Sequence, residues 1–407
     1  MNHCSTNTFP AGGASPSGLH QLHNLARWAR RLCLVFLVGL VAIPAQTIFA
    51  DNVVGGESTQ YVRIQVVEVV RGLEHPWSLA FLPDGSYLVT ERPGRLNRVR
   101  NGEITRITGL PEDIHARGQG GLMEVLPHPD FAENGWVYLT YSRGDSQGTA
   151  TTLIRGRLEG DRLVEVERLF TQDRMSSPGR HYGSKLAWTP EGYLLMSIGD
   201  RGGEPPRAQD LADAAGTLLR LTEDGKPAPG NPFLDKEGAL PEIYSYGHRN
   251  IQGLIVNAEN GEIWSTEHGP RGGDELNRHE AGGNYGWPVV SRGLDYRTQE
   301  TFRHTEARHS VPGMIDPVYE LLPTLAPSGL ALVTTDRYNR WQGDLIAGGL
   351  RAERLRRLVV QDDEVLHDEE LILGMIGRIR DVRESPDGYL YVLNDRRDGG
   401  IYRIEPQ

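Results

Sequence analysis

Short stretches of alternating apolar and polar residues, each introduced by a tight-turn sequence, recur six times between residues 83 and 395. Turns of the Pro-Asp-Gly or Asn-Gly type are strong signals for chain reversal between β-strands. The six stretches are Ser86–Glu91, Trp136–Ser142, Tyr193–Asp200, Glu262–Glu267, Asp344–Gly348 and Tyr389–Asp395. Further β-like runs follow several of them, for example Gly94–Arg100, Arg351–Val360 and Gly400–Glu405. The pattern predicts an all-β chain.

The spacing of these turns indicates how the strands are grouped. The turn glycines lie roughly 45 to 80 residues apart, a spacing that suits blades of four strands. One blade cannot bury both of its faces, whereas a ring of blades buries them and leaves only short edges. We therefore expect a six-bladed β-propeller with four-stranded antiparallel blades, with a pair of β-sandwiches as the alternative. The long interval between Gly261 and Gly343 should hold a large loop, and such loops often form binding sites.

The first 50 residues differ from the rest of the chain. They contain no Asp or Glu, and three arginines precede the apolar run Leu32–Ile43, which Pro44 ends. This order is typical of a secretory signal peptide. The run falls short of the about 20 residues that a membrane-spanning helix needs, although an N-terminal anchor is the alternative. We expect a leader over residues 1–50, a single β-propeller catalytic domain over residues 51–407, and a periplasmic or secreted protein.

Composition then excludes several kinds of chemistry. Both cysteines, Cys4 and Cys33, lie in the leader, so the exported chain has no disulfide, thiol nucleophile, zinc–thiolate site or covalent haem. Loss of the leader removes three positive charges and no negative one, which moves the net charge from −11 to −14. An acidic surface argues against nucleic acid or an anionic membrane as a partner.

Candidate catalytic groups lie next to predicted strands. His181 directly precedes the predicted strand Leu186–Thr189 and can act as a general base, because imidazole titrates near neutral pH. Arg249 offers a fixed cation for an oxyanion or a carboxylate, and Asn250 can orient a ligand through its amide. The alternatives are a structural histidine at the first position and a turn held by its own side chains at the second.

The densest polar segment runs from Glu267 to Asn277 and continues through residues 282–288. Its glycines and Pro270 fold the backbone tightly and can turn carbonyl groups inward, while Asp274 and Glu275 add adjacent carboxylates. Calcium prefers such hard oxygen ligands, although the spacing is not that of an EF-hand. A long polar loop without metal is the alternative.

Other candidate residues suit an anionic ligand. Arg378 and Arg380 alternate on a predicted strand and share a face, where two guanidinium groups usually need an anionic partner. A salt-bridged sheet edge is the alternative. Arg351 is a further candidate cation, and Gln119 lies on a glycine-rich loop that can approach a ligand closely. Together these residues suit a cofactor with several carboxylates, although they do not name it.

Taken in order, the motifs resemble the soluble family of glucose and aldose sugar dehydrogenases that depend on pyrroloquinoline quinone (PQQ), including glucose/sorbosone dehydrogenase-like proteins. The resemblance runs from Gly72 to Ile404. It is carried by GLEHPWSLAFLPDG, GQGGLMEVLPHPDF, HYGSKLAWTPEGYLLMSIGD, YSYGHRNIQGL, HGPRGGDELN with GGNYGWP, LAPSGLAL and GRIRDVRESPDGYLYVLND. It implies PQQ- and Ca²⁺-dependent oxidation of aldoses at the anomeric carbon to lactones. The electron acceptor must be a separate molecule, because no C-x-x-C-H haem motif is present.

The resemblance also implies roles for the catalytic candidates. His181 would be the general base that takes the hydroxyl proton of the sugar. Arg249 and Asn250 would hydrogen-bond the reacting edge of PQQ, with Arg249 also stabilising charge that develops there. Gln119 would contact substrate and cofactor.

Further roles concern the anionic and metal ligands. Arg351, Arg378 and Arg380 would neutralise or stack on PQQ, and the carbonyl groups of Gly269 and Pro270 would bind its Ca²⁺. A second, structural Ca²⁺ would be held by Asp274, Glu275 and the carbonyl group of Tyr285. This chain departs from the family at Arg180, where glucose-specific members have an acidic residue, and at Arg351, where lysine is common.

Two other functions are compatible with a propeller, since fold alone does not determine function. A calcium-dependent lactonase or esterase would hydrolyse lactones without PQQ. A non-enzymatic propeller would bind a carbohydrate or a protein without turnover.

Overall fold

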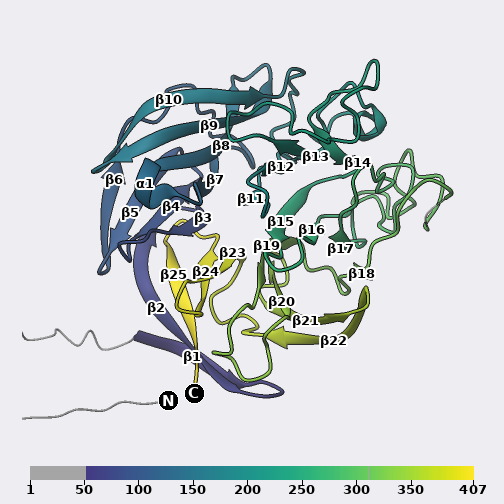
Figure 1. The fold of residues 1–407 in the computed structure, drawn as a ribbon. Helices are drawn as coiled ribbons and strands as arrows, with labels where there is room; N and C mark the ends of the chain where they lie inside the picture. The colour runs from purple at the N-terminus through teal and green to yellow at the C-terminus, as the bar shows by residue number, and fades with distance from the viewer. Residues whose placement is uncertain (1–51, 310) are drawn as a thin grey trace, which may run out of the picture. The chain divides into compact units, whose positions relative to one another are not determined.

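Twenty-five strands, paired into six antiparallel sheets, form most of the regular structure in the computed structural model, which describes residues 52–309 and 311–407. The predicted leader, residues 1–50, lies outside the described residues. The sheets stand around a common centre like blades (Figure 1). Helical structure among the described residues is limited to α1 (Phe131–Asn134) and a 3-10 turn (Pro205–Gln209). Neither is long and apolar enough to cross a membrane.

Five blades have four strands each and follow one another along the chain. Blade one contains β3 (Pro76–Phe81), β4 (Tyr87–Glu91), β5 (Arg95–Arg100) and β6 (Glu103–Ile107). Blade two contains β7 (Leu122–Pro127), β8 (Trp136–Gly144), β9 (Thr149–Glu159) and β10 (Arg162–Thr171). Blade three contains β11 (Leu186–Trp188), β12 (Leu194–Ile198), β13 (Thr217–Leu221) and β14 (Ile243–Tyr246). Blade four contains β15 (Ile251–Val256), β16 (Ile263–Glu267), β17 (Glu275–Arg278) and β18 (Tyr319–Glu320). Blade five contains β19 (Pro327–Leu332), β20 (Leu345–Gly349), β21 (Leu355–Gln361) and β22 (Glu364–Leu371).

The sixth blade joins the two ends of the described chain. Its strands are, in spatial order, β1 (Asn52–Ser58), β2 (Arg63–Leu73), β25 (Gly399–Pro406), β24 (Leu390–Asn394) and β23 (Ile379–Glu384). β2 pairs with β25 from Ile64 opposite Pro406 to Leu73 opposite Gly399. The predicted six-bladed propeller is therefore confirmed, with one strand more in the closing blade than the expected four.

The six turn-and-strand repeats of the sequence correspond to one element of each blade. They contain β4, β8, β12, β16, β20 and β24, which are the second strands counted from the ring centre. The turn signals connect each innermost strand to this second strand. Because the pairs are antiparallel, the start of each innermost strand and the end of each second strand lie together at the opposite end of the ring.

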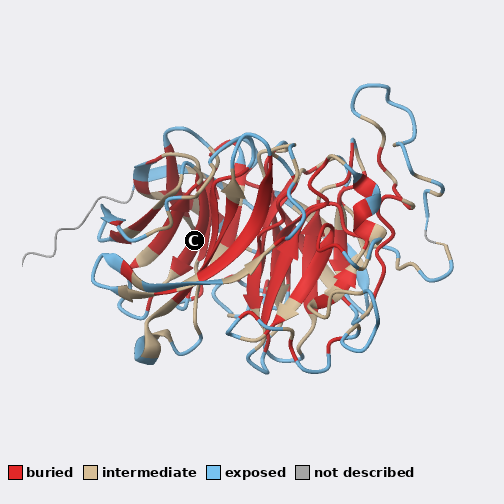
Figure 2. Ribbon diagram, turned by 90° about the horizontal axis from the view of Figure 1, so that it is seen from above, coloured by how far each residue is buried: buried red, intermediate tan, exposed pale blue. Residues whose placement is uncertain are grey.

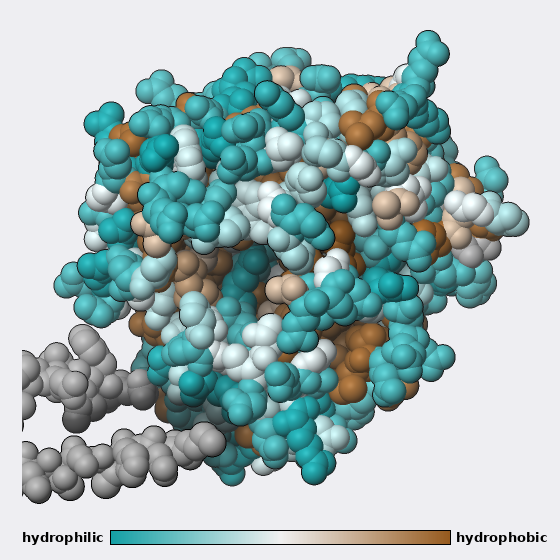
Figure 3. Space-filling view, viewed as in Figure 1, coloured by the Kyte–Doolittle hydropathy of each residue, from teal (hydrophilic) through white to brown (hydrophobic). Residues whose placement is uncertain are grey.

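The innermost strands β3, β7, β11, β15, β19 and β23 contact one another in sequence and close the ring. Figure 2 shows that the strands are buried along much of their length, whereas the loops at their ends are largely exposed. The face drawn in Figure 3 is largely hydrophilic and is hollowed near the centre of the ring.

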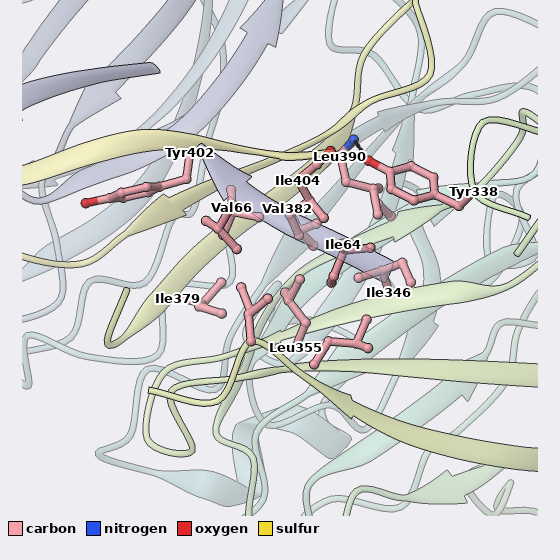
Figure 4. Packing of buried hydrophobic residues seen from close by; sticks show 14 of the residues in the cluster. Ile64, Val66, Tyr338, Ile346, Leu355, Ile379, Val382, Leu390, Tyr402 and Ile404 are labelled. Carbon is pink, nitrogen blue, oxygen red and sulfur yellow. Dashed lines mark hydrogen bonds between the residues drawn. The ribbon is translucent and has the colours of Figure 1, made fainter. Parts of the chain in front are cut away.

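Apolar packing joins the closing blade to blade five. Ile64 of β2 and Ile404 of β25 are fully buried in a cluster that includes Ile346 of β20 (Figure 4). Tyr338 adds hydrogen bonds to this cluster, since its hydroxyl accepts from the backbone N–H of Leu390 at 2.8 Å and donates to the carbonyl of Ile404 at 2.6 Å. Apolar burial and these hydrogen bonds together fix blade six against its neighbour.

Three buried charged residues and the partly buried Arg383 connect the innermost strands. Lys185 Nζ lies 3.0 Å from Glu124 Oε2 and 2.8 Å from Asp381 Oδ1. Arg383 Nε lies 2.9 Å from Asp381 Oδ2, and its Nη2 contacts Glu124. Glu124 lies on β7, Asp381 and Arg383 lie on β23, and Lys185 directly precedes β11. Two cations thus balance two carboxylates at the centre of the ring, and we call these residues the central charge cluster.

The substitution Lys185→Met tests the central charge cluster. It leaves two buried carboxylates with one cation, and breaking a buried pair in this way costs about 3–5 kcal/mol. We expect a loss of that size in the free energy of unfolding, measured by urea denaturation. The exposed Lys226 supplies the control, because Lys226→Met should change the free energy by less than about 0.5 kcal/mol. Equal stability of the two variants would contradict the assigned role.

Candidate active site

Three adjoining cavities lie at the end of the ring where the innermost strands begin. The first and largest, lined by His181, has a volume of about 690 Å³. The second, lined by Arg378 and Arg380, has a volume of about 180 Å³. The third, lined by Asp274 and Arg351, has a volume of about 320 Å³. His268 lines all three, and Gln119 and Asn250 line both the first and the second. The sequence-predicted residues in these walls are Gln119, His181, Arg249, Asn250, Asp274, Arg351, Arg378 and Arg380.

His181 is buried in the wall of the largest cavity and is held by a carboxylate. Its Nδ1 lies 2.6 Å from Oδ1 of Asp200, which follows β12. The other carboxylate oxygen of Asp200 accepts the indole N–H of Trp287 at 2.8 Å. Although burial opposes ionisation of Asp200, His181 and Arg249 hold its pKa below the usual value. An ionised Asp200 places the imidazole proton on Nδ1, which leaves the Nε2 lone pair free to accept a proton.

The pKa of His181 is lowered from its ordinary value of 6.5. Burial is the largest cause and the nearby Arg249 guanidinium adds to it, whereas Asp200 acts in the opposite direction. The imidazole is therefore neutral at neutral pH, which is the state that a general base requires.

Arg249 and Asn250 precede β15 and are fixed from several sides. Glu267 accepts a hydrogen bond from the backbone N–H of Arg249, whose Nη1 donates to the carbonyl of His268 at 3.0 Å. The Nε of Arg249 is buried without a hydrogen-bond partner among the described residues. Asn250 accepts the backbone N–H of Gly183 through Oδ1 at 3.0 Å, so its amide N–H groups remain for a ligand.

Gln119 reaches the same wall from the loop before β7. Its Oε1 accepts the backbone N–H of His181 at 2.8 Å, which ties the glycine-rich loop to the imidazole. The side-chain N–H groups of Gln119 are then available to the cavities that it lines.

The second cavity is strongly basic. Arg380 donates from Nη1 to Gln252 Oε1 at 3.0 Å, and Arg378 donates from Nη2 to Asp395 Oδ2 at 3.3 Å. Burial opposes ionisation of Asp395, but its cationic neighbours, above all Arg380, lower its pKa to about 2. Arg92 lines this cavity too, so three guanidinium groups face one carboxylate. The excess positive charge suits a ligand with further carboxylates.

The predicted calcium ligands differ in their surroundings, and only Asp274 among them lines one of the three cavities. Asp274 accepts the backbone N–H of Gly269 at 3.1 Å and that of Ala326 at 2.8 Å, and burial raises its pKa to about 6. No backbone hydrogen bond to the carbonyl groups of Gly269 or Pro270 is found within residues 52–309 and 311–407. These two carbonyls fit the oxygen donors that Ca²⁺ takes.

Glu275 and Tyr285 lie outside the walls of the three cavities. Glu275 on β17 pairs with Glu267 on β16, and burial together with that neighbouring carboxylate raises its pKa to about 8. The ring of Tyr285 stacks on His248 with centroids 4.7 Å apart. No cluster of three or more His, Cys, Asp or Glu side chains suited to a metal occurs in the described part of the chain. The second calcium site therefore stays a prediction.

With this geometry in view, comparison with known proteins identifies the family. A family model described as glucose/sorbosone dehydrogenase matches residues 73–403. The chain belongs to the glucose/sorbosone dehydrogenase family. One relative, aldose sugar dehydrogenase YliI of Escherichia coli (strain K12), is 39% identical over 349 residues, which cover 84% of this chain and 93% of the relative.

Solved structures agree with membership of the glucose/sorbosone dehydrogenase family. The apo-form of the soluble aldose sugar dehydrogenase from Escherichia coli is 37% identical, with a TM-score of 0.81 over 84% of this chain and 100% of that one. The PQQ-bound form of an aldose sugar dehydrogenase from Streptomyces coelicolor is 27% identical, with a TM-score of 0.69 over 86% of this chain and 99% of that one.

Several residues of this candidate site escaped the sequence analysis. Asp200 and Asp395 each follow a second strand, and this shared position at the end of a repeat was a signal that could have identified them. His268 also directly follows a second strand, β16, and lies in the polar segment Glu267–Asn277, but it was not singled out there. Burial lowers its pKa to about 3, and its Nε2 has no hydrogen-bond partner among the described residues. A buried polar atom of this kind in the wall of all three cavities indicates a place for a ligand.

The contact between His181 and Asp200 predicts how the imidazole titrates. Since Asp200 raises the pKa of His181 against burial and Arg249, Asp200→Asn should lower that pKa further. Nuclear magnetic resonance with labelled histidine measures the shift, and the His181 signal is the one lost in His181→Gln. The exposed Asp235 supplies the control, because Asp235→Asn should leave the titration unchanged. A higher pKa in Asp200→Asn would contradict the assignment.

Proposed function

We propose that this protein is a PQQ- and calcium-dependent aldose dehydrogenase that oxidises the anomeric carbon and yields a lactone. The observation that carries the proposal is the position of His181, whose imidazole, held by Asp200, lines a cavity that adjoins the arginine-rich cavity of Arg378 and Arg380. The names of two similar proteins support it, because one is an aldose sugar dehydrogenase and another is the PQQ-bound form of such an enzyme.

The residues of the chain would divide the chemistry between them. His181 Nε2 accepts the proton of the anomeric hydroxyl group, and Asp200 stabilises the imidazolium that forms. When bound, PQQ supplies the acceptor for the hydride that leaves the anomeric carbon, and Ca²⁺ beside it polarises the quinone oxygens. Arg249 and Asn250 direct positive charge and amide donors toward the place where negative charge develops.

The cofactor would be held by groups that are otherwise incompletely paired. Arg378, Arg380 and Arg351 would bind its carboxylates, and the carbonyl groups of Gly269 and Pro270 would bind Ca²⁺. Asp274 would position that turn, because it accepts the backbone N–H of Gly269. The electrons would pass to a separate acceptor, and residues 1–50 would direct export to the periplasm or the medium.

Reconstitution of the cofactor-free protein tests the proposal. We expect aldose-dependent dye reduction only after PQQ and Ca²⁺ are added, and His181→Gln should lower kcat about 10²- to 10⁴-fold, because a general base typically contributes that much. PQQ binding, followed by absorbance, should be unchanged in this variant. The matched control is His367→Gln, an exposed position on the outermost strand β22, which should keep full activity.

Two outcomes would favour the other functions. Lactone hydrolysis without PQQ would identify a lactonase or esterase. A protein that neither binds PQQ nor turns over any sugar or lactone would be a binding propeller. Full dye reduction by His181→Gln would contradict the role of the imidazole alone.

A further inference from the structure

The outer wall of the largest cavity carries three exposed arginines, Arg180, Arg297 and Arg303. None of them forms a salt bridge within residues 52–309 and 311–407, although the charge of Arg297 acts on the nearby carboxylate of Asp295. Arg180 donates from Nη2 to the carbonyl of Gly202 at 2.7 Å, and Arg303 donates from Nη2 to the carbonyl of Gly203 at 3.2 Å. Carbonyl partners orient the guanidinium groups and leave their full charge in place.

The two carboxylates that line this cavity, Asp200 and Asp295, already accept hydrogen bonds from other groups of the chain. Asp200 is bound to His181 and Trp287. Asp295 accepts the backbone N–H groups of Thr298 at 3.0 Å and Arg297 at 2.9 Å, and these hydrogen bonds together with the Arg297 guanidinium lower its pKa. With Arg249, the described walls contain four guanidinium groups and two carboxylates. The chain as a whole has a net charge of −11, so this cavity reverses the sign of its surroundings.

The segment that carries Arg297 and Arg303 contacts neighbouring parts of the chain. It connects β17 to β18, and within it Leu294 pairs with Thr301 across a short hairpin. The backbone groups of Arg271 and Leu294 exchange two hydrogen bonds of 2.9 Å, which join this hairpin to the turn that follows Pro270. Phe302 packs on Trp287 with ring centroids 4.8 Å apart. The backbone on both sides of Arg297 is therefore held against neighbouring parts of the chain.

Other arginines suit the carboxylates of the proposed cofactor. The groups that suit its carboxylates, Arg378 and Arg380, line the second cavity together with Arg92, and Arg180, Arg297 and Arg303 do not line that cavity. The outer arginines instead share the first cavity with the imidazole of His181. Their charge is thus placed to act on whatever occupies the cavity beside the general base.

We propose that Arg180, Arg297 and Arg303 bind an anionic substituent remote from the anomeric carbon, so that the preferred substrate is an acidic aldose. This inference rests on the proposed function and specifies its substrate class. A carboxylate, as in a uronic acid, and a phosphate, as in a sugar phosphate, both offer oxygens that a guanidinium fork can bind in a bidentate manner. The reaction at the anomeric carbon is unchanged: the hydroxyl proton goes to His181 and the hydride goes to the bound cofactor.

Three sugars that differ at one carbon test the inference with the PQQ- and Ca²⁺-loaded enzyme. They are D-glucose, D-glucuronate and D-glucose 6-phosphate. At low ionic strength we expect kcat/KM at least tenfold higher for one or both acidic sugars than for glucose, and this advantage should shrink as salt is added. The comparison of glucuronate with glucose 6-phosphate identifies which anionic group is preferred. A kcat/KM for glucose equal to or above both acidic sugars would overturn the inference.

The double substitution Arg297→Gln with Arg303→Gln tests the residues themselves. It should lower the ratio of kcat/KM for the acidic sugar to that for glucose about tenfold. The change should arise mainly in KM, because the variant loses guanidinium contacts to the anionic group of the sugar. Arg308→Gln is the matched control, because Arg308 lies on the same loop, donates to the carbonyl of Arg292 and does not line the cavity. An unchanged ratio in the double variant would overturn the assignment.

Calorimetric titration of the cofactor-free protein separates this inference from the proposed function. D-glucuronate or glucose 6-phosphate should bind with salt-sensitive heat, and D-glucose should bind more weakly. If the loaded enzyme oxidises no sugar, the proposed function fails, and the calorimetry then decides the anion site alone. If glucose is oxidised but no acidic sugar is bound or preferred, the anion site fails and the proposed function stands.

Discussion

Pairing between β2 and β25 is the constraint on which the site depends. It joins Ile64–Leu73 to Gly399–Pro406 and brings blade one against blade six. At that seam, His75 Nδ1 lies 2.7 Å from Asp395 Oδ1, and the backbone N–H of His75 donates to the carbonyl of Arg396 at 2.7 Å. The basic second cavity takes Arg92 from one side of the seam and Arg378 from the other. An open ring would separate these groups, so the cavity exists only in the closed fold.

Charge is balanced in one part of the ring and unbalanced in another. The central charge cluster contains two cations and two carboxylates in contact, and it serves to hold β7 and β23 together. The cavities above it contain more guanidinium groups than carboxylates. Arg249 and Arg380 are largely buried among these groups, and because burial makes a charge costly, they suit an anionic ligand that adds negative charge. This contrast separates groups that stabilise the ring from groups that suit ligands.

Local signals explain which parts of the fold were predictable. Each repeat begins with a hairpin turn whose residues determine its geometry, so the second strands were located from sequence alone. The extra strand β1 was missed, because its membership of the closing blade depends on β2 pairing with β25, far away in the sequence. The site followed the same rule. His181, Arg249, His268 and Arg378 all belong to dense motifs, but only the fold shows that His268 lines all three cavities.

The central charge cluster affects how small molecules can reach the cavities. Its side chains lie among the innermost strands, and Lys185, Glu124 and Asp381 are at most 2% exposed. Solvent therefore hardly reaches these three side chains from either end of the ring. Under the proposed function, the sugar and the electron acceptor reach the site through the same cavity entrance. The lactone must then leave before the electron acceptor can bind. Sugar and electron acceptor would then bind one after the other, and each would compete with the other for the entrance of the cavity.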